Sequence, residues 1–479
     1  MSGPADAPRA ASRAGLFGWV LFDWACQPFF TLVSTFVFAP YFASALAASP
    51  AEGQALWGYA TAAAGLALGL LSPVLGSIAD AGGAKKPWIA ASGAVLALTC
   101  AALWFAAPGM PGAIPLALTA FAVATVAAEI AAVFNNAMMP HLVPPERMGR
   151  LSGTGWAVGY AGGLVSLILV LGFLAPNPET GRTYLGLAPL IGGAPSDRAG
   201  DRATGPFSAL WLFVFLLPLF VATPDAPRSG LRPGAAVREG LARLKGTLGE
   251  ARRRPALLRF LIANMVYQDG LVALFAFGGI YGAGVFGWGA LELGLFGIGL
   301  TVTGTLGALA GGALDDRIGA RAVILSGLAA LVVVCLGILS LGREHVLFLV
   351  ATAPKAQGAG PFSTAPEQAY LALGLVIGAV AGPVQASSRS LLGRLVPPRE
   401  AGRYFGLLAL SGKVTSFLAP LTVALATDAT GRQVAGLAVL VAFFGLGALL
   451  LARAGAGSCA PETGDRGTAG SGPDVAALP

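Results

Sequence analysis

Long apolar runs, separated by short stretches rich in Gly, Pro and charge, recur along almost the whole chain. A helix needs ~20 apolar residues to cross the ~30 Å hydrocarbon core of a bilayer. Every run is of about that length or longer. The pattern therefore predicts twelve transmembrane helices, over residues 15–42, 55–78, 88–107, 113–137, 151–175, 206–222, 257–285, 290–314, 322–341, 369–392, 404–427 and 432–453.

The composition supports a membrane protein. Of the 479 residues, 56% are hydrophobic and only 11% are charged, and the mean hydropathy is +0.74. A soluble domain carries about a quarter charged residues, so this chain lacks the surface that would keep it in solution. The run over 15–42 is about twice as long as the ~7–15 apolar residues of a signal peptide. We interpret it as a retained first helix and expect an all-α membrane protein.

The basic residues predict how the chain is oriented and divided. With the N-terminus in the cytoplasm, 22 of the 30 Lys and Arg residues fall in cytoplasmic segments and 6 in outer loops, which agrees with the positive-inside rule. Because the charge is spread between apolar runs, we expect no nucleic-acid partner. The expected parts are a cytoplasmic tail (1–14), a six-helix bundle (15–222), a basic cytoplasmic linker (223–256), a second six-helix bundle (257–453) and a disordered cytoplasmic tail (454–479).

The two halves of the chain share three features in the same order. Their separations are 236, 253 and 246 residues, which indicates a duplicated six-helix unit. Two parallel six-helix repeats describe the major facilitator architecture, and the first pair resembles the loop signature of that superfamily. The matching stretches are Gly76-Ser-Ile-Ala-Asp80-Ala-Gly-Gly-Ala-Lys85 with Gly312-Ala-Leu-Asp-Asp316-Arg-Ile-Gly-Ala-Arg321, Leu142-Val-Pro-Pro145 with Leu395-Val-Pro-Pro398, and Asp23 with Asp269.

These loop motifs predict a gate at the cytoplasmic helix ends. A short turn that contains Gly lets two helices approach closely, and the acidic and basic residues beside it can pair with neighbouring helix ends. Simple helix capping and topology marking is the alternative interpretation. The predicted gate residues are Asp80, Lys85, Arg150, Asp316, Arg321 and Arg403.

Five charged residues lie well inside predicted spans: Asp23, Glu129, Asp269, Arg389 and Lys413. A charge at the bilayer centre costs ~2.5–3.5 kcal/mol on insertion scales, so such residues face the interior of a bundle and mark functional paths. They stand on the first, fourth, seventh, tenth and eleventh helices. In a major facilitator bundle the first, fourth, seventh and tenth line the central cavity.

Helical spacing adds polar and aromatic neighbours to these charges, namely Gln27, Asn136, Tyr267 and Gln385. Together with the five charges they form the predicted substrate-binding set, in which Asp23, Glu129 and Asp269 are also candidates for proton coupling. Structural ion pairs are the alternative. For the aromatic residues we favour packing or interface anchoring over substrate contact, although they could also line the site; they are Trp19, Phe22, Trp24, Tyr160 and Tyr267.

Other chemistry is missing from the sequence. There is no Walker A, GxSxG or HExxH motif, and the four cysteines, Cys26, Cys100, Cys335 and Cys459, stand far apart. We therefore expect no enzyme, no direct drive by ATP, no cofactor, no metal site and no disulfide.

Several motifs together resemble the vacuolar-effluxer-like branch of the major facilitator superfamily, whose characterised member is a fungal autophagy-related exporter of amino acids from the vacuole. The resemblance spans nearly the whole membrane region and implies export of small molecules, with amino acids as the leading class. The motifs are Trp19-Val-Leu-Phe-Asp23-Trp-Ala, Phe38-Ala-Pro-Tyr-Phe42, Pro140-His-Leu-Val-Pro-Pro145, Tyr267-Gln-Asp269-Gly, Phe275-Ala-Phe-Gly-Gly-Ile-Tyr281, Gly382-Pro-Val-Gln385-Ala-Ser-Ser-Arg389 and Ala409-Leu-Ser-Gly-Lys413.

The resulting hypothesis is a monomeric secondary active or facilitative transporter that moves amino acids or a related zwitterion by alternating access, in the direction of efflux and with protons as the candidate coupling ion. Arg outnumbers Lys 25 to 5, which is typical of a GC-rich bacterial genome and hence of a bacterial inner membrane. A drug/proton antiporter of the same fold is one alternative. A membrane receptor or scaffold that does not transport is another.

Overall fold

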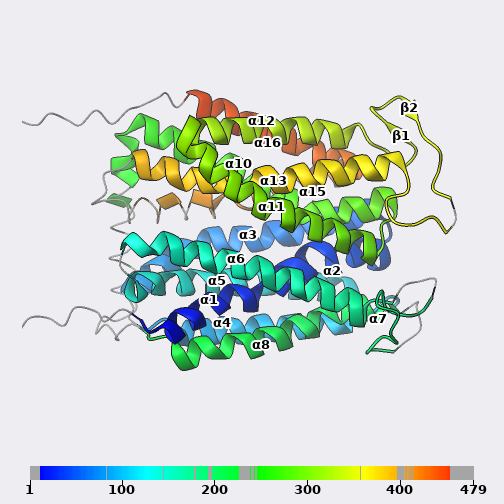
Figure 1. Ribbon diagram of the computed structural model, residues 1–479, viewed down its shortest axis with the longest axis horizontal. Coiled ribbons are helices and arrows are strands. Elements are labelled where there is room, and N and C mark those ends of the chain that lie inside the picture. The colour runs from blue at the N-terminus through cyan, green and yellow to red at the C-terminus, as the bar shows by residue number, and fades with distance from the viewer. Residues whose placement is uncertain are drawn as a thin grey trace, which may run out of the picture.

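The computed structural model of the chain is a bundle of long helices that run side by side (Figure 1). It describes residues 11–81, 84–143, 145–176, 180–192, 197–225, 248–356, 358–395 and 414–453, with a few isolated positions between them. The first helix begins and the last one ends at the same end of the bundle. We call this the termini end, and the opposite one the far end.

The first half of the chain supplies the lower layer of Figure 1. Helices prevail because in lipid each backbone N–H and C=O must be paired within its own segment. The elements are α1 (Arg13–Pro28), η1 (Phe29–Phe36), α2 (Phe38–Tyr41), η2 (Phe42–Leu46), α3 (Pro50–Ala81), α4 (Lys86–Ala102), η3 (Leu103–Phe105), α5 (Ala113–Leu142), α6 (Pro145–Leu169), η4 (Val170–Leu174), α7 (Ala199–Arg202) and α8 (Thr204–Ala222).

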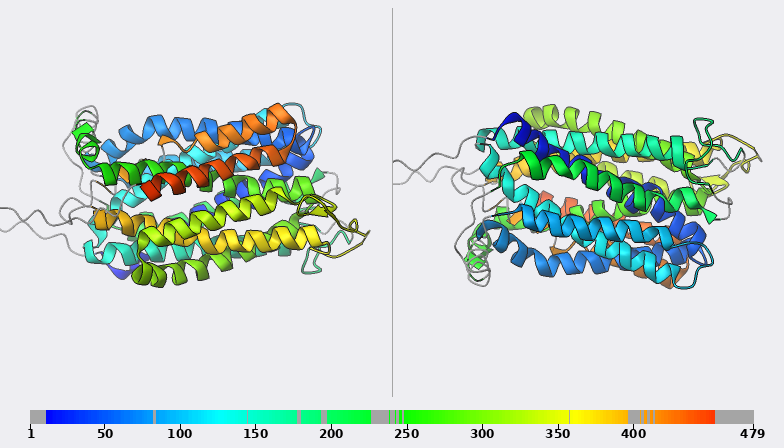
Figure 2. Two further views of the ribbon diagram at one scale, coloured as in Figure 1. Left: turned by 90° about the horizontal axis from the view of Figure 1, so that it is seen from above. Right: turned by 90° about the horizontal axis from the view of Figure 1, so that it is seen from below.

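The second half forms the upper layer and carries the small antiparallel hairpin of β1 (His345–Val346) and β2 (Val350–Ala351) at the far end, which both views of Figure 2 place outside the bundle. The sequence pattern does not predict this hairpin, because its strands are only two residues long. The helices are α10 (Pro255–Phe286), α11 (Ala290–Ile318), α12 (Ala320–Leu339), α13 (Ala365–Leu395), α15 (Leu418–Thr430) and α16 (Gln433–Arg453).

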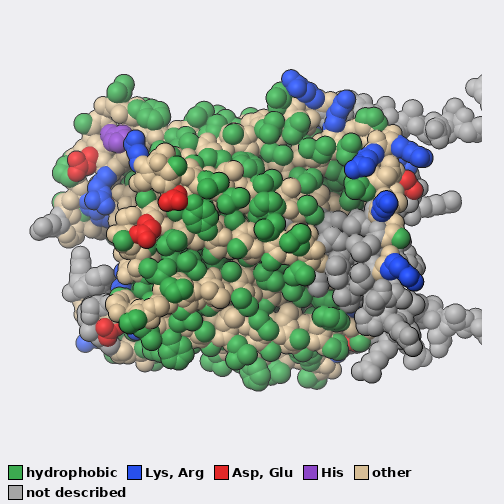
Figure 3. All heavy atoms as spheres, turned by 180° about the vertical axis from the view of Figure 1, so that it is seen from behind, with side chains coloured by type: hydrophobic (Ala, Val, Ile, Leu, Met, Phe, Trp, Pro, Cys, Tyr) green, Lys and Arg blue, Asp and Glu red, His purple; other side chains and the backbone are tan. Residues whose placement is uncertain are grey.

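Eleven segments of the described chain are long and apolar enough to cross a membrane, and a twelfth, Leu418–Thr430, is a shorter apolar helix. The twelve follow the predicted segments in order and confirm an all-α membrane fold. Hydrophobic side chains dominate the middle of the face that Figure 3 shows, and the charged side chains on it gather towards the two ends. The face is therefore suited to contact lipid along its middle.

The helix contacts confirm the internal repeat. In the first half α1 packs against α6 and α8, α4 packs against α5 and α8, and α3 packs against α5. In the second half α10 packs against α15 and α16, α12 packs against α13 and α16, and α11 packs against α13. The two sets are the same once α1, α3, α4, α5, α6 and α8 are matched with α10, α11, α12, α13, α15 and α16. The fold is thus two copies of one six-helix unit.

The loop motif of the second half makes a very tight turn. Only Gly319 separates α11 from α12, and its φ is +85°. Residues with a Cβ rarely adopt such a φ, so this position requires glycine. The sequence motif thus has the structural role expected of it in this half, while its counterpart Gly83 lies outside the described residues.

Irregular turns occur in several predicted spans, and two of them bear on the site. The first span includes the π-helix η1 (Phe29–Phe36), which widens the helix after Pro28. The eleventh span, predicted as continuous over 404–427, is interrupted by a turn at residues 415–417, after which α15 begins. Both irregularities lie beside residues of the candidate site.

Candidate functional site

The carboxylate of Asp23 lies against a glycine-lined stretch of α6. A Cβ at Gly155 would stand only 2.6 Å from Asp23 Oδ2, and one at Gly159 would stand 3.1 Å from Asp23 Cβ. The same stripe continues at Gly162 and Gly163, so α1 and α6 approach closely over two turns. Small residues at such spacing let membrane helices come together, and here they also make room for a carboxylate.

Glu129 on α5 lies near the same place. The buried Cys26 thiol is within electrostatic range of both Asp23 and Glu129. Asn136, two turns along α5 towards the termini end, is exposed. Gln27 is half-buried, and its Nε2 is 3.5 Å from Thr31 Oγ1 in η1.

Arg389 on α13 reaches across to the first half. Its guanidinium lies over the ring of Trp156 on α6, with Cζ 5.7 Å from the ring centroid, and it interacts electrostatically with Tyr160 one turn further on. Among the described residues it has no hydrogen-bond or ion-pair partner, and its side chain is exposed. Gln385, one turn before Arg389, is half-buried.

The structure buries Tyr267 on α10, whose side chain is 0% exposed. Its hydroxyl is 2.7 Å from Ser388 Oγ on α13. Tyr267 therefore joins α10 to α13 inside the second half, while the neighbouring Arg389 points towards α6. This arrangement does not bring Tyr267 together with Asp23 or Glu129.

Asp269 is also buried, with 1% exposed. Its Oδ2 accepts a hydrogen bond from the backbone N–H of Ala419, at 3.1 Å, in the first turn of α15. A helix N-terminus offers unpaired N–H groups and a partial positive charge, so the carboxylate caps the broken eleventh span. Its Oδ1 has no partner among the described residues.

The remaining predicted residues divide into packing residues and residues that are not described. Trp19 and Phe22 are buried, and Trp24 stacks on Trp211 with ring centroids 5.5 Å apart. Their packing supports the interpretation favoured from the sequence. Lys413 lies outside the described residues.

Of the predicted gate residues, two are described with their side chains. Lys85 precedes α4, and its backbone N–H donates to Asp225 Oδ1 at 2.8 Å, while that of Lys86 donates to Oδ2 at 3.1 Å. Arg321 donates to the backbone carbonyl of Ala452 at the end of α16. Both contacts lie within one half and fit the capping alternative. Asp80, Arg150 and Asp316 lie in helices without described side chains, and Arg403 lies outside the described residues.

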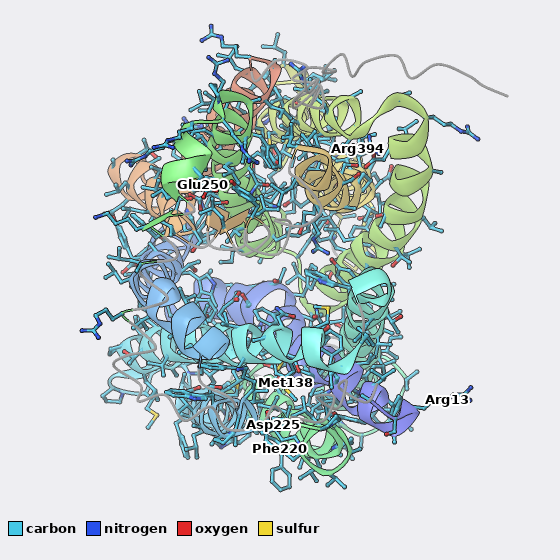
Figure 4. The ribbon with its side chains drawn as sticks, turned by 90° about the vertical axis from the view of Figure 1, so that its left-hand side faces the viewer. Arg13, Met138, Phe220, Asp225, Glu250 and Arg394 are labelled. Carbon is cyan, nitrogen blue, oxygen red and sulfur yellow. The ribbon has the colours of Figure 1, made fainter. Side chains whose placement is uncertain are left out.

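Beside Asp316, one of the predicted gate residues, lies an ion pair that the sequence did not predict. Arg394 at the end of α13 pairs with Asp315 on α11 at 2.8 Å. Figure 4 looks onto this end and shows Arg394 and Glu250 in the second half and Met138, Phe220 and Asp225 in the first. Asp315 directly precedes Asp316 of the loop motif, so the motif locates this contact to within one residue.

At the far end a buried polar cluster joins the two halves. Gln54 Nε2 on α3 donates to Thr427 Oγ1 on α15 at 2.8 Å and to the Gln433 carbonyl at 3.2 Å. Gln433 Nε2 donates back to the Pro50 carbonyl at 3.1 Å. Gln54 and Thr427 are 0% exposed. We call Gln54, Thr427 and Gln433 the far-end lock. No charge or motif in the sequence pointed to it.

A second polar cluster at the far end lies within the second half. Lys355 Nζ is 2.8 Å from Glu367 Oε1 and 3.5 Å from Glu292 Oε1. Partial burial lowers the pKa of Lys355, but hydrogen bonding and attraction to the two carboxylates exceed this effect, and the net pKa is raised. The cluster therefore keeps the loop before α13 attached at neutral pH.

Trp156 is a residue of the site that the sequence did not predict. Trp156 follows Gly155 and stands four residues before Tyr160, so its place on a face of α6 was visible. Its partner Arg389 stands on another helix of the other half, which no local pattern reveals. In the described residues no group of three or more His, Cys, Asp or Glu side chains could hold a metal ion.

Comparison with known proteins identifies the family. The model of the family described as "Vacuole effluxer Atg22 like" matches residues 52–457. The chain belongs to this family. Together with the fold, this makes it a multi-pass membrane transporter of the major facilitator type.

Relatives of this Atg22-like chain occur in a bacterium and in a fungus. An uncharacterised MFS-type transporter of Bacillus subtilis, YxiO, is 27% identical over 448 residues, which cover 91% of this chain and 93% of the relative. The autophagy-related protein 22-1 of Neosartorya fischeri is 24% identical over 294 residues, which cover 59% of this chain and 44% of the fungal protein. The likeness to the fungal protein thus spans less than half of that protein's length.

Solved transporters share the fold. A bacterial homologue of the human lysosomal transporter Spinster, inward-facing and occupied, gives a TM-score of 0.64 at 14% identity, with 92% of this chain and 96% of that chain covered. The inward-open xylose transporter XylE from E. coli gives 0.57 at 14% identity, with 92% and 94% covered. At such identities the likeness concerns the major facilitator fold alone.

Proposed function

We propose that this Atg22-like protein moves a small zwitterionic solute, with amino acids as the leading class, by alternating access. The observation that carries the proposal is the Arg389 guanidinium, which is exposed between the halves and has no ion-pair partner among the described residues. A charge inside a bilayer is costly. A charged side chain that forms no structural ion pair is available to bind a ligand.

The chemistry of Arg389 favours a carboxylate. A guanidinium presents five N–H donors in a rigid plane that matches the two oxygens of a carboxylate. The half-buried amide of Gln385 lies one turn away on the same helix and can add a further hydrogen bond. Gln385 and Arg389 are therefore our candidates for binding the acidic end of the solute.

The acidic side chains of the first half suit the other end of a zwitterion. Asp23 and Glu129 both lie near Cys26 on α1 and can attract an ammonium group. Either one can instead carry a coupling proton, as can Asp269, whose Oδ1 has no hydrogen-bond partner within the described ranges. Asn136, Tyr267 and Lys413 stay in the proposed site as predictions.

The direction, the membrane and the assembly are also part of the proposal. The Lys and Arg distribution supports N- and C-termini in the cytoplasm, so that the termini end faces inwards. The resemblance to vacuolar effluxers supports efflux, and the Arg-rich composition supports a bacterial inner membrane. We expect a monomer without a cofactor.

Counterflow of labelled amino acids in proteoliposomes tests the proposal. We expect uptake above that of empty liposomes for at least one amino acid, and a strong loss of uptake in Arg389→Ala. Arg389→Lys keeps the charge but not the planar donors, so it should retain part of the activity. No uptake for the whole set would refute the substrate class.

The same variants distinguish a drug/proton antiporter. Such a protein would protect cells against hydrophobic cations and would not need Arg389. Protection by both the wild type and Arg389→Ala would favour the antiporter. Ligand binding without any change in exposure from the two membrane faces would instead favour a receptor.

A further inference from the structure

The Arg389 guanidinium packs over the ring of Trp156. Cζ lies 5.7 Å from the ring centroid, which is within the ~6 Å range of a cation–π contact. The two residues come from different halves, since Trp156 stands on α6 and Arg389 on α13. A ring from one half thus contacts a cation of the other half that has no ion-pair partner in the described part of the chain.

We infer that Trp156 is a positioning residue, whose ring holds Arg389 so that the guanidinium donors stay free for a substrate carboxylate. The inference rests on the proposed function for the identity of the ligand, but not for the contact itself. A ring attracts the face of a cation, whereas guanidinium N–H groups donate within their plane. Because the five N–H donors of the guanidinium spread around Cζ, a single ring cannot occupy them all, and the donors directed away from Trp156 stay available to a carboxylate.

The Trp156 ring is itself packed against neighbouring residues. Trp156 contacts Tyr160 one turn away, with centroids 5.8 Å apart and an interplanar angle of 50°. The adjacent Gly155 packs against Asp23, which ties this turn of α6 to α1. A free Arg side chain must lose rotamer freedom when it binds a ligand. A ring that orders it beforehand lowers this cost and favours solutes with a carboxylate.

The chain offers a control of the same chemistry. Arg202 lies over the ring of Trp104 with Cζ 4.7 Å from the centroid, at the far end of the first half. This pair lies within one half and takes no part in the candidate site. Trp104→Leu therefore removes the same kind of contact at a place where no effect on the solute is expected.

The first experiment needs no substrate. Purified wild type, Trp156→Leu, Trp156→Phe and Trp104→Leu react with phenylglyoxal, and the modification of each Arg is followed by peptide mass spectrometry, with exposed Arg432 as reference. The reagent attacks the uncharged guanidine, which a cation–π contact disfavours. We expect Trp156→Leu to speed the labelling of Arg389 about two- to fivefold and Trp156→Phe to have a smaller effect. Trp104→Leu should speed Arg202 alone.

The second experiment measures counterflow of the best amino acid. Trp156→Leu should raise KM several-fold while the maximal rate changes little, and in an Arg389→Gln background it should add almost nothing. Trp104→Leu should behave as wild type. An equal effect of Trp156→Leu with and without Arg389 would show that the ring acts on its own, and would overturn the inference.

The two experiments separate the inference from the proposed function. Faster labelling of Arg389 in a protein that transports no amino acid would leave the Trp156 contact in place and refute the substrate class. Unchanged labelling of Arg389 in Trp156→Leu would refute the positioning role, whatever the protein transports. Labelling and KM that change together would support both.

Discussion

Asp23 packs against the glycines of α6, and the recess that these glycines leave accommodates its side chain. A methyl group at Gly155 would stand too close to the Asp23 carboxylate, and one at Gly159 would be in tight contact with Asp23 Cβ. Among the described residues Asp23 has no ion-pair partner. The recess therefore keeps the carboxylate available to a solute or a proton, and at the same time allows α1 and α6 to touch.

Gly155→Ala should damage both stability and transport. The new Cβ would stand 2.6 Å from Asp23 Oδ2, so the Asp23 carboxylate must leave its present position. Overpacking of this kind costs about 1–3 kcal/mol. We expect a lower Tm in a thermal unfolding assay in detergent, together with reduced counterflow.

Gly445→Ala is the matched control, because a Cβ at this helical glycine in α16 meets nothing within 4 Å. It should leave counterflow unchanged and leave Tm unchanged or slightly raised, since Ala favours helix over Gly. Similar losses in the two variants would show that the recess at Asp23 has no special role.

At the scale of elements, the interruption before α15 is tied to α10 by one side chain. The turn at residues 415–417 leaves the first N–H groups of α15 without partners of their own helix. Broken helices occur at membrane depth only where other groups satisfy the backbone. Asp269 does this for Ala419, so the start of α15 depends on a residue of the seventh span.

Asp269→Ala should therefore be clearly less stable than Asp269→Asn. The amide oxygen of Asn can still accept the Ala419 N–H, as Asn is a good N-cap, whereas loss of a buried acceptor costs about 1–3 kcal/mol. We expect Tm to fall in the Ala variant and to change little in the Asn variant. Equal Tm values for Asp269→Ala and the wild type would contradict the capping role.

The Asn variant also tests proton coupling. It keeps the cap but cannot carry a proton at this position. If Asp269 is the coupling site, Asp269→Asn should lose accumulation driven by a pH gradient while counterflow without a gradient continues. Retained gradient-driven accumulation would leave Asp23 and Glu129 as the remaining candidates.

These elements show what the sequence could predict. Apolar runs gave the twelve segments because lipid selects directly for length and hydropathy. The break at residues 415–417 has a local signal in Pro420, which cannot donate to the Ser416 carbonyl four residues earlier and whose ring crowds that turn. The sequence does not show the cap, because the Asp269 carboxylate that accepts the Ala419 N–H stands on α10, 150 residues earlier. The charged site residues were visible from their cost in lipid, whereas the partner of Arg389 depends on how the halves meet.

At the scale of the molecule, the two halves are held together most clearly at the far end. The far-end lock is buried, and next to it the Gly279 backbone lies close to the Thr35 carbonyl of η1. α3 packs along α15, and α6 packs along α11. Alternating access requires the far-end contacts to open, so the lock should contribute to the balance between the two states.

Gln54→Leu should shift this balance towards a state open at the far end. It removes two buried hydrogen bonds between the halves, each worth ~0.5–1.5 kcal/mol. A cysteine introduced at Thr35 should then react several-fold faster with an impermeant thiol reagent applied to the far-end face of the membrane. The cysteines that the structure describes are buried, so background labelling should be low.

Tyr59→Phe is the control for the same seam. It removes the exposed hydrogen bond from Tyr59 to Asp428 Oδ2, at 2.9 Å, between α3 and α15. Water can replace an exposed bond at little cost, so labelling should stay near the wild-type rate. Equal acceleration by the two variants would mean that any contact along the seam limits opening.

The segment that connects the two halves forms hydrogen bonds at both of its described ends, residues 225 and 248–250. Asp225 caps α4 of the first half, and Glu250 accepts a hydrogen bond from Tyr404 Oη of the second half at 3.3 Å. The first half therefore holds residue 225, and the second half holds residue 250. It follows that the gene could be split between codons 225 and 248, and that two separately translated polypeptides should assemble into an active transporter.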